Sequence, residues 1–166
     1  MSRPVTADEF ARLVARLGAA ATAGDAPGFA ACFTEDGVYR DYIYGPHKGR
    51  VAIAGMLADL FHRDAAGYDW RFFDAVTDGR VGYARSLSRF VSTIPEFKGR
   101  EVVIDGISRF VLEDGLIAEY HESVNGGVAM VQLGVAAPRM EKVFRRWADR
   151  MLAEDEVAAY RAGFRK

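Results

Sequence analysis

Two carboxylates and a tyrosine stand on predicted strands at positions where their side chains could exchange protons with a ligand. Tyr39 and Asp41 lie two residues apart, so they share one face of a strand predicted over residues 38–43. Glu122 belongs to the last predicted strand, over residues 116–125. Alternation leaves its direction open, because both faces of that strand contain a charge. If Glu122 faces inward among apolar neighbours, desolvation raises the pKa of its carboxyl group and makes it a candidate acid or base.

An arginine on a third predicted strand completes the set of candidate catalytic residues. Arg85 lies in a strand predicted over residues 81–93 and shares a face with Leu87 and Arg89. A buried guanidinium needs a partner, so Arg85 has two interpretations. It could orient a substrate oxygen that carries negative charge, or it could neutralise a carboxylate inside the fold.

Alternation along the predicted strand over residues 101–112 separates an inner face from an outer face. The inner set contains Val102, Ile104, Gly106, Ser108, Phe110 and Leu112, and the outer set contains Glu101, Val103, Asp105, Ile107 and Arg109. We therefore expect an apolar pocket, to which the neighbouring strands also contribute. Its predicted ligand-contacting residues are Ile104, Phe110, Tyr120, Val124, Leu87 and Arg89.

The histidines and glycines show no pattern of a metal or nucleotide site. His47 lies in a Gly/Pro segment, His62 ends a predicted helix, and His121 points away from Glu122 by alternation. They lack the spacing of zinc ligands. No glycine-rich loop follows a strand, as phosphate binding would require. We therefore expect no metal and no cofactor.

The order of the predicted elements defines an α+β fold. Thr6 and Glu9 have the spacing of a helix capping box, and Phe10, Leu13 and Leu17 recur on one face of the helix that follows. Four consecutive predicted strands joined by short turns must be antiparallel. The strands span residues 70–76, 81–93, 101–112 and 116–125, after a first strand at 38–43 and a helix at 53–61. We expect a curved antiparallel sheet with the helices packed on one face.

The end of the chain returns to a helical pattern. Met140, Val143, Phe144, Trp147 and Met151 form an apolar stripe, and basic and acidic residues cover the opposite side. We predict a cone-shaped α+β domain over residues 1–137 and a C-terminal helical extension of it over residues 138–166.

Composition limits the class of partner. The 166 residues include 22 Lys and Arg against 23 Asp and Glu, so there is no basic surface for nucleic acid or an anionic membrane. No apolar stretch is long enough to span a membrane, and the sequence MSRPVTADEF lacks the pattern of a secretory leader. The single cysteine, Cys32, cannot form an internal disulfide. We expect a cytoplasmic protein.

Two segments resemble a known family. The limonene epoxide hydrolases have a strand that opens with Y-x-N and a helix that opens with GR, which this chain resembles in VYRDYIYGPHKGR (38–50) and ADLF (58–61). Their closing hairpin, with its G-R start and W-R-D-Y-F-D end, resembles GREVVIDGISRFVLEDGLIAEYHESVN (99–125). With its order of elements, the chain resembles the nuclear-transport-factor-2-like superfamily. The ketosteroid isomerases, SnoaL-like polyketide cyclases and limonene epoxide hydrolases share that cone-shaped fold.

The resemblance implies roles for the candidate residues. Tyr39 stands where the hydrolase tyrosine holds the attacking water, and Asp41 replaces the asparagine that helps it. Arg85 stands where the family has the arginine of its R-x-D pair. Glu122 replaces the second aspartate, which acts as the base.

One residue argues against epoxide opening. Leu87 stands where the aspartate of the R-x-D pair would protonate the epoxide. A shift of the hairpin register could bring Arg89 to that place, but arginine does not donate a proton at neutral pH. The missing acid motivates the alternative that the chain is a non-catalytic module for a small molecule or a protein. A purely structural dimer partner is a third interpretation.

The leading hypothesis is a cofactor-independent acid/base enzyme that acts on a hydrophobic small molecule, as an isomerase, cyclase, lyase or epoxide hydrolase would. Glu122 or Asp41 would remove a proton, Tyr39 would hydrogen-bond to the oxygen that gains charge, and Arg85 would stabilise that charge. We also expect a homodimer, because the outer sheet face with Val103, Ile107 and Asp105 is too apolar to remain fully exposed to water, and members of this superfamily commonly pair through their sheets.

Overall fold

The computed structural model describes residues 3–164 and has two helices before a six-stranded sheet and further helices between its second and third strands. The helices of the first part are α1 (Ala7–Ala23), α2 (Ala26–Ala30), α3 (Arg50–Met56) and α4 (His62–Asp64), with a π-helical turn η1 (Leu57–Phe61) between α3 and α4. The strands are β1 (Phe33–Asp41), β2 (Gly45–Lys48), β3 (Ala65–Thr77), β4 (Val81–Ser92), β5 (Glu101–Glu113) and β6 (Leu116–Val124). A 3-10 turn η2 (Pro95–Phe97) joins β4 to β5, and α5 (Gly126–Leu133) follows β6. The predicted α+β class is confirmed.

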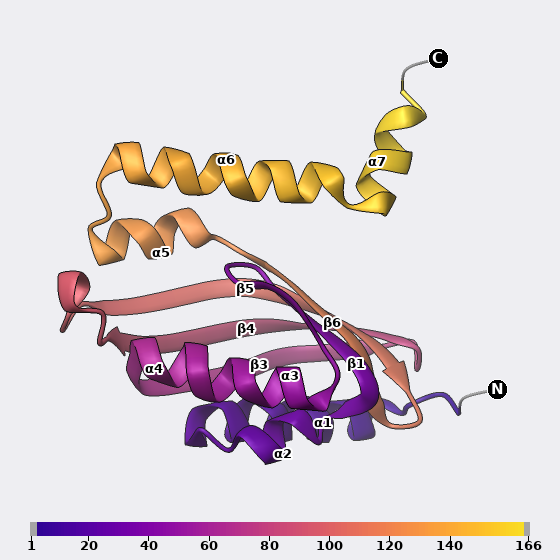
Figure 1. Ribbon diagram of the computed structural model, residues 1–166. Helices are drawn as coiled ribbons and strands as arrows, with labels where there is room; N and C mark the ends of the chain where they lie inside the picture. Colours follow the sequence, from indigo (N-terminus) through magenta and orange to yellow (C-terminus); the bar gives the residue numbers. More distant parts are fainter. Residues whose placement is uncertain (1–2, 165–166) are drawn as a thin grey trace. The chain divides into compact units, whose positions relative to one another are not determined.

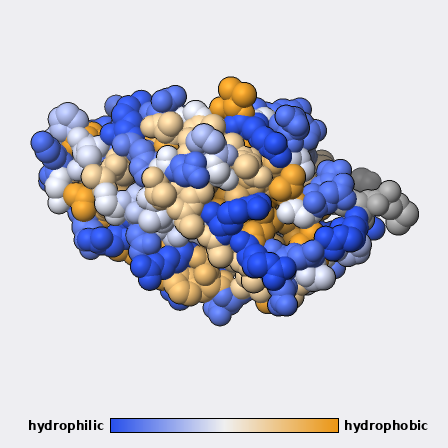
Figure 2. All heavy atoms as spheres, turned by 90° about the horizontal axis from the view of Figure 1, so that it is seen from below, coloured by the Kyte–Doolittle hydropathy of each residue, from blue (hydrophilic) through white to orange (hydrophobic). Residues whose placement is uncertain are grey.

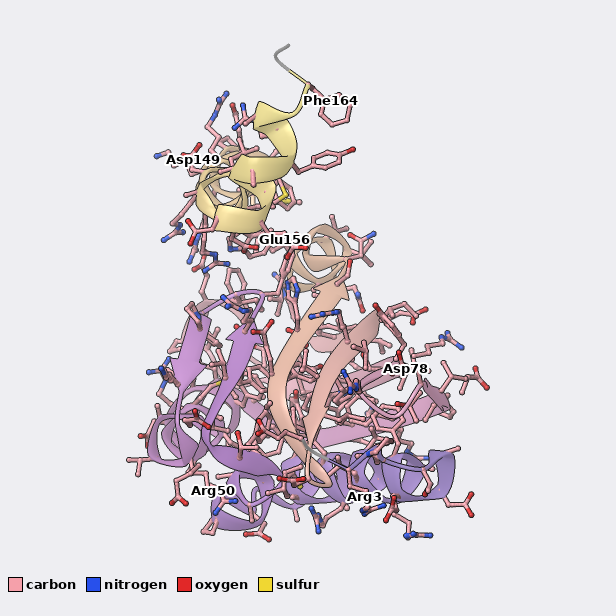
Figure 3. All side chains as sticks on the ribbon, turned by 90° about the vertical axis from the view of Figure 1, so that its right-hand side faces the viewer. Arg3, Arg50, Asp78, Asp149, Glu156 and Phe164 are labelled. Carbon is pink, nitrogen blue, oxygen red and sulfur yellow. The ribbon has the colours of Figure 1, made fainter. Side chains whose placement is uncertain are left out.

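The first helix begins at the predicted capping box. The Thr6 hydroxyl accepts a hydrogen bond from the Glu9 backbone N–H at 3.3 Å, and the Glu9 carboxylate accepts one from the Thr6 N–H at 2.8 Å. Arg3, which is labelled in Figure 3, adds an ion pair to Glu9. The helix ends at Gly24 in the left-handed region, with φ of 69°. These signals fix the ends of the helix that lies under the sheet.

The strands follow the order β2-β1-β6-β5-β4-β3. Strands β3 to β6 form the predicted antiparallel meander. Strand β1, however, pairs with β6 in parallel, with Tyr39 opposite Tyr120. No hairpin joins these two strands, because β2, the helical segments after it and strands β3 to β5 lie between them in the sequence. The sheet is therefore mixed at this one pair, a correction to the fully antiparallel prediction.

The sheet curves over helices α1 to α4, which lie along one of its faces (Figure 1). Register shifts in β3, between Ala66 and Asp69 and between Phe73 and Val76, mark irregularities that bend a strand. Helix α1 approaches the sheet closely where side chains are absent. A Cβ atom at Gly18 would lie 2.7 Å from the Trp70 carbonyl oxygen. In Figure 2, the face seen from below has residues of intermediate hydropathy across its middle and blue hydrophilic residues at many points of its outline.

Two segments differ from the predicted elements. Strand β1 begins at Phe33 and not at residue 38, although the sequence Thr-Glu-Asp-Gly at 34–37 is typical of a turn, and its register shifts between Phe33 and Val38. The Gly/Pro segment around His47 forms β2, in which His47 pairs with Tyr39. Pro46 and the glycines favour a loop, but an edge strand tolerates proline because one side of its backbone needs no partner.

The beginning of β5 extends beyond β6 and pairs with a helix side chain. The Val103 N–H donates to Gln132 Oε1 at 2.9 Å, and Gln132 Nε2 donates to the Val103 carbonyl at 2.9 Å. Gln132 lies on α5, so this helix supplies the bonds that another strand would make. Within the described residues, no helix is long and apolar enough to cross a membrane.

The second part of the chain consists of α6 (Ala137–Ala153) and α7 (Asp155–Ala162). The chain divides into two units after Leu133, whereas the sequence pattern placed the division after residue 137. The predicted apolar stripe lies on α6, where the rings of Phe144 and Trp147 meet edge to face with centroids 5.7 Å apart. On the same helix Arg145 pairs with Glu141. Asp149 on α6 and Glu156 on α7 are labelled in Figure 3.

Candidate functional site

The inner face of the sheet forms a pocket of about 90 Å³. Its wall is mostly aromatic and aliphatic, with two serines and two carboxylates. The lining residues are Tyr39, Tyr44, Phe61, Tyr68, Trp70 and Phe90, then Ile43, Leu60, Ala65, Ile104 and Val124, then Ser86, Ser88, Asp41 and Glu122. The two lining residues of η1 come from a π-helical turn, a rare structure that often occurs at functional sites.

Glu122 faces this pocket from β6. Its Oε2 accepts a hydrogen bond from the Tyr120 hydroxyl at 3.1 Å, and its Oε1 lies 3.4 Å from the Tyr42 backbone N–H. Burial and, after it, the negative charge of Asp41 raise the pKa of Glu122 to about 8, although the two hydrogen bonds oppose the rise. Both forms of the carboxyl group are therefore populated near neutral pH.

Asp41 ends β1 and is buried, with 6% of its surface exposed. Its Oδ1 accepts hydrogen bonds from the backbone N–H groups of Ile43 at 2.8 Å and Tyr44 at 2.5 Å. This is the geometry by which an aspartate side chain holds a turn. Asp41 thus shapes the pocket wall that contains Ile43 and Tyr44, and it places a second negative charge beside Glu122.

Stacked tyrosines connect the two strands beneath the carboxylates. The rings of Tyr39 and Tyr120 are stacked with centroids 4.5 Å apart, and both side chains are fully buried. The Tyr120 hydroxyl also lies 2.8 Å from Ser108 Oγ. Burial raises the pKa of Tyr39, of Tyr120 and of the pocket residue Tyr68, and the charge of Glu122 raises each further. These phenols remain protonated and act as hydrogen-bond donors at neutral pH.

The structure places Arg85, Leu87 and Arg89 on the opposite face of the sheet, which corrects their predicted place in the pocket. Arg85 donates two hydrogen bonds to Asp105, at 3.1 and 3.0 Å, and its side chain is 47% exposed. Arg89 pairs with Glu101 in the same way. The resemblance implied an inward place for Arg85, and alternation put Arg89 on the same face, whereas charge pairing across β4 and β5 holds both outside.

The small residues of β4 occupy the inner face instead. Ala84, Ser86 and Ser88 alternate with the arginines, and all three are buried. The concave side of a curved sheet has little room, so a run of small residues at every second position is the signal that identifies it. Ser86 and Ser88 line the pocket and were missed by the sequence analysis.

The remaining predicted contacts divide between pocket and core. Ile104 and Val124 line the pocket. Phe110 is fully buried in the core, where its ring meets Phe10 edge to face at 5.2 Å, and it is absent from the lining. Tyr120 is also buried behind the lining, and it reaches the site through its hydrogen bond to Glu122. The residues that form the hydrophobic wall therefore agree only in part with the predicted ones.

The tyrosine at position 68 was not identified from the sequence. The predicted strand began at Trp70, but β3 begins at Ala65, so Tyr68 lies on a strand and faces the pocket. Gly67 favours a turn in the sequence, and its φ of 60° shows that the backbone does deviate there. A hydrogen bond with Ser88 holds the Tyr68 side chain.

The described residues include no group of three histidine, cysteine or acidic side chains that could hold a metal ion. His62 Nε2 lies 2.8 Å from the Ala21 carbonyl oxygen, and His121 is exposed. His47 Nε2 is buried and without a hydrogen-bond partner, and burial lowers the pKa of His47. The pocket side chains that can transfer protons are therefore carboxyl and hydroxyl groups.

A family model for the SnoaL-like domain matches residues 14–120, and the chain belongs to this family, within the nuclear-transport-factor-2-like superfamily. No protein of curated function matches the sequence at a significant level.

Solved structures with low sequence identity have the same fold. A hypothetical protein with a ketosteroid isomerase-like fold from Catenulispora acidiphila, solved in complex with trimethylamine, is 17% identical with a TM-score of 0.68, covering 76% of this chain and 95% of that one. An epoxide hydrolase of the limonene epoxide hydrolase type from M. tuberculosis is 16% identical with a TM-score of 0.63, covering 76% and 90%. TsrD from Streptomyces laurentii is 18% identical with a TM-score of 0.69, covering 79% and 98%.

Proposed function

We propose that the protein is a cofactor-independent acid/base enzyme that acts on a hydrophobic small molecule in this pocket. One observation carries the proposal: Glu122 lines an apolar cavity, where burial and Asp41 raise the pKa of its carboxyl group to about 8. A group with a pKa near the working pH can both take and return a proton. The membership in a family with cyclase-like and hydrolase-like relatives, and the related protein that binds trimethylamine, support a small-molecule ligand.

The chemistry follows from the neighbours of Glu122. Ionised Glu122 removes a proton from a carbon or from water, and the Tyr120 hydroxyl orients the carboxylate through its hydrogen bond to Oε2. Tyr68 keeps its proton, so it donates a hydrogen bond to a substrate oxygen that gains negative charge. The hydroxyl of Tyr39 hydrogen-bonds to Tyr120 and so supports the group that orients Glu122. Protonated Glu122 then returns the proton to the product. Arg85 has no part in these steps.

After burial, the charge of Asp41 contributes most to the raised pKa of Glu122, and an asparagine at position 41 tests this role. Asp41→Asn keeps a side-chain oxygen for the two backbone N–H groups but removes the charge. We expect the pKa of Glu122 to fall, because the ionised form no longer meets a neighbouring carboxylate. The pH profile of proton abstraction should then shift to lower pH. Asp41→Ala also loses the hydrogen bonds that hold the turn, so comparison of the two variants separates structural effects from those of the charge. An Asp41→Asn profile that is not shifted would contradict the proposed effect of Asp41 on Glu122.

We further propose that the protein forms a homodimer through the outer face of its sheet. Large apolar side chains are exposed there beside the Arg85–Asp105 pair, and an exposed apolar patch of this kind is typical of an interface. The exposed residues are Phe73, Val76, Tyr83, Val103 and Ile107. Light scattering at micromolar concentration should give twice the monomer mass, and Ile107→Asp should give the monomer mass. A monomeric wild-type chain contradicts this proposal.

A further inference from the structure

The pocket wall formed by the described residues contains acidic side chains and no basic ones. Among residues 3–164, the lining includes Asp41 and Glu122, and it includes no lysine, arginine or histidine. Arg85 and Arg89 of β4 pair with acidic residues of β5 on the other face of the sheet. The interactions that shift the pKa of Glu122 include the charge of Asp41 and no positive charge. A ligand that brings a cation would stabilise the ionised carboxylates, and an anionic ligand would be repelled.

The apolar part of the same wall is rich in aromatic rings. Tyr39, Tyr44, Phe61, Tyr68 and Trp70 line the cavity with Phe90. The faces of aromatic rings attract cations, and recognition of alkylated ammonium groups by several such rings is a common use of this interaction. Alkyl substituents on the nitrogen would contact the apolar surface. A single alkylated ammonium group could therefore interact with the aromatic rings and with the carboxylates at the same time.

We infer that the ligand of this pocket contains a compact alkylated ammonium group, held among the aromatic rings beside Glu122 and Asp41. The inference rests on the proposed function, because it concerns the same cavity, and it adds the class of substrate. The small cavity favours a small head group.

Binding of such a cation is linked to pH through Glu122. The groups that act on its carboxyl are Asp41 and the Tyr42 N–H at the end of β1 and Tyr120 on β6, while Glu122 in turn raises the pKa of Tyr39, Tyr120 and Tyr68. The tyrosines stay neutral, so the group of this set that changes charge near pH 8 is Glu122. A bound cation favours the ionised form of Glu122, so its affinity increases as the pH rises toward the pKa of Glu122. Below that pKa, binding of the cation releases a proton from Glu122.

A pair of isosteric probes tests the inference. Choline and 3,3-dimethylbutan-1-ol have nearly the same shape, but only choline carries a charge. Calorimetric titration of the wild-type chain at pH 6, 7.5 and 9 should show choline binding at least about tenfold more tightly than the alcohol at pH 9. Its affinity should fall by up to about tenfold for each pH unit below 8, while that of the alcohol should not. Glu122→Gln should remove this pH dependence.

Equal or tighter binding of the alcohol at pH 9, or no binding of either probe at millimolar concentration, would overturn the inference. These results come from the wild-type chain, so they do not depend on whether the variant folds. Proton abstraction by Glu122 is measured separately with a neutral substrate. If the alcohol binds better and that activity persists, the ammonium inference fails and the acid/base function stands. If choline binds as expected and Glu122→Gln leaves proton abstraction unchanged, the acid/base function fails.

Discussion

Glu122→Gln is expected to lower the rate of proton abstraction by about 10²- to 10⁴-fold, the usual contribution of a positioned general base. The amide has nearly the same size and can still accept the hydrogen bond from Tyr120, but it cannot take up a proton. The neutral probe 5-nitrobenzisoxazole suits the measurement. A base removes its ring C–H proton, the N–O bond breaks, and the coloured phenolate that forms is followed by absorbance.

The wild-type rate should rise with pH and level off above the pKa of Glu122, because only the ionised carboxylate is a base. The midpoint is expected at about 8. Glu119→Gln is the matched control, since Glu119 lies on the same strand, pairs with Arg40 outside the pocket, and should keep the wild-type rate. If both Glu122→Gln and Asp41→Asn retain full activity, the acid/base proposal is wrong, and a non-catalytic binding module becomes the better interpretation.

The sequence predicted the fold more fully than the site, and β4 shows why. Alternation correctly grouped Arg85, Leu87 and Arg89 on one face, but it does not tell which face is concave. That information lies in the neighbouring strand. Asp105 and Glu101 were already placed on the outer face of β5, and each pairs with one of the arginines. Complementary charges on adjacent strands could therefore have placed both arginines outside.

The direction of Glu122 could not be decided from alternation for a different reason. Both Ile117 and Tyr120 are fully buried, although they lie three residues apart and a regular strand would point them to opposite faces. The register between β5 and β6 shifts at Val111 and Leu112, so one irregularity reverses the alternation between these two residues. Such a shift depends on the partner strand, and the sequence of β6 alone contains no sign of it.

The raised pKa of Glu122 also makes a prediction about stability. A carboxyl group whose pKa is higher in the folded chain than in the unfolded chain stabilises the fold most at low pH. That contribution is lost as the pH rises from the ordinary value of 4.5 through about 8, where the buried group finally ionises. Between pH 5 and pH 9 the difference amounts to about 4 kcal/mol in the free energy of unfolding.

Glu122→Gln removes this penalty, because an amide is neutral at every pH in the window. At pH 5 the variant should be no more stable than the wild-type chain. In the variant an NH₂ group faces the Tyr42 N–H, and this group cannot accept the weak hydrogen bond that Glu122 Oε1 accepts. At pH 9 it should be more stable by about 3 kcal/mol, after about 1 kcal/mol is lost with that contact. Urea unfolding of both chains at the two pH values gives the difference, in which the titrating groups that do not interact with Glu122 cancel. Glu119→Gln should follow the wild-type curve. A wild-type-to-Gln difference that is the same at pH 5 and pH 9 would mean that Glu122 ionises normally in the fold, and the same carboxylate could then not act as a poised base.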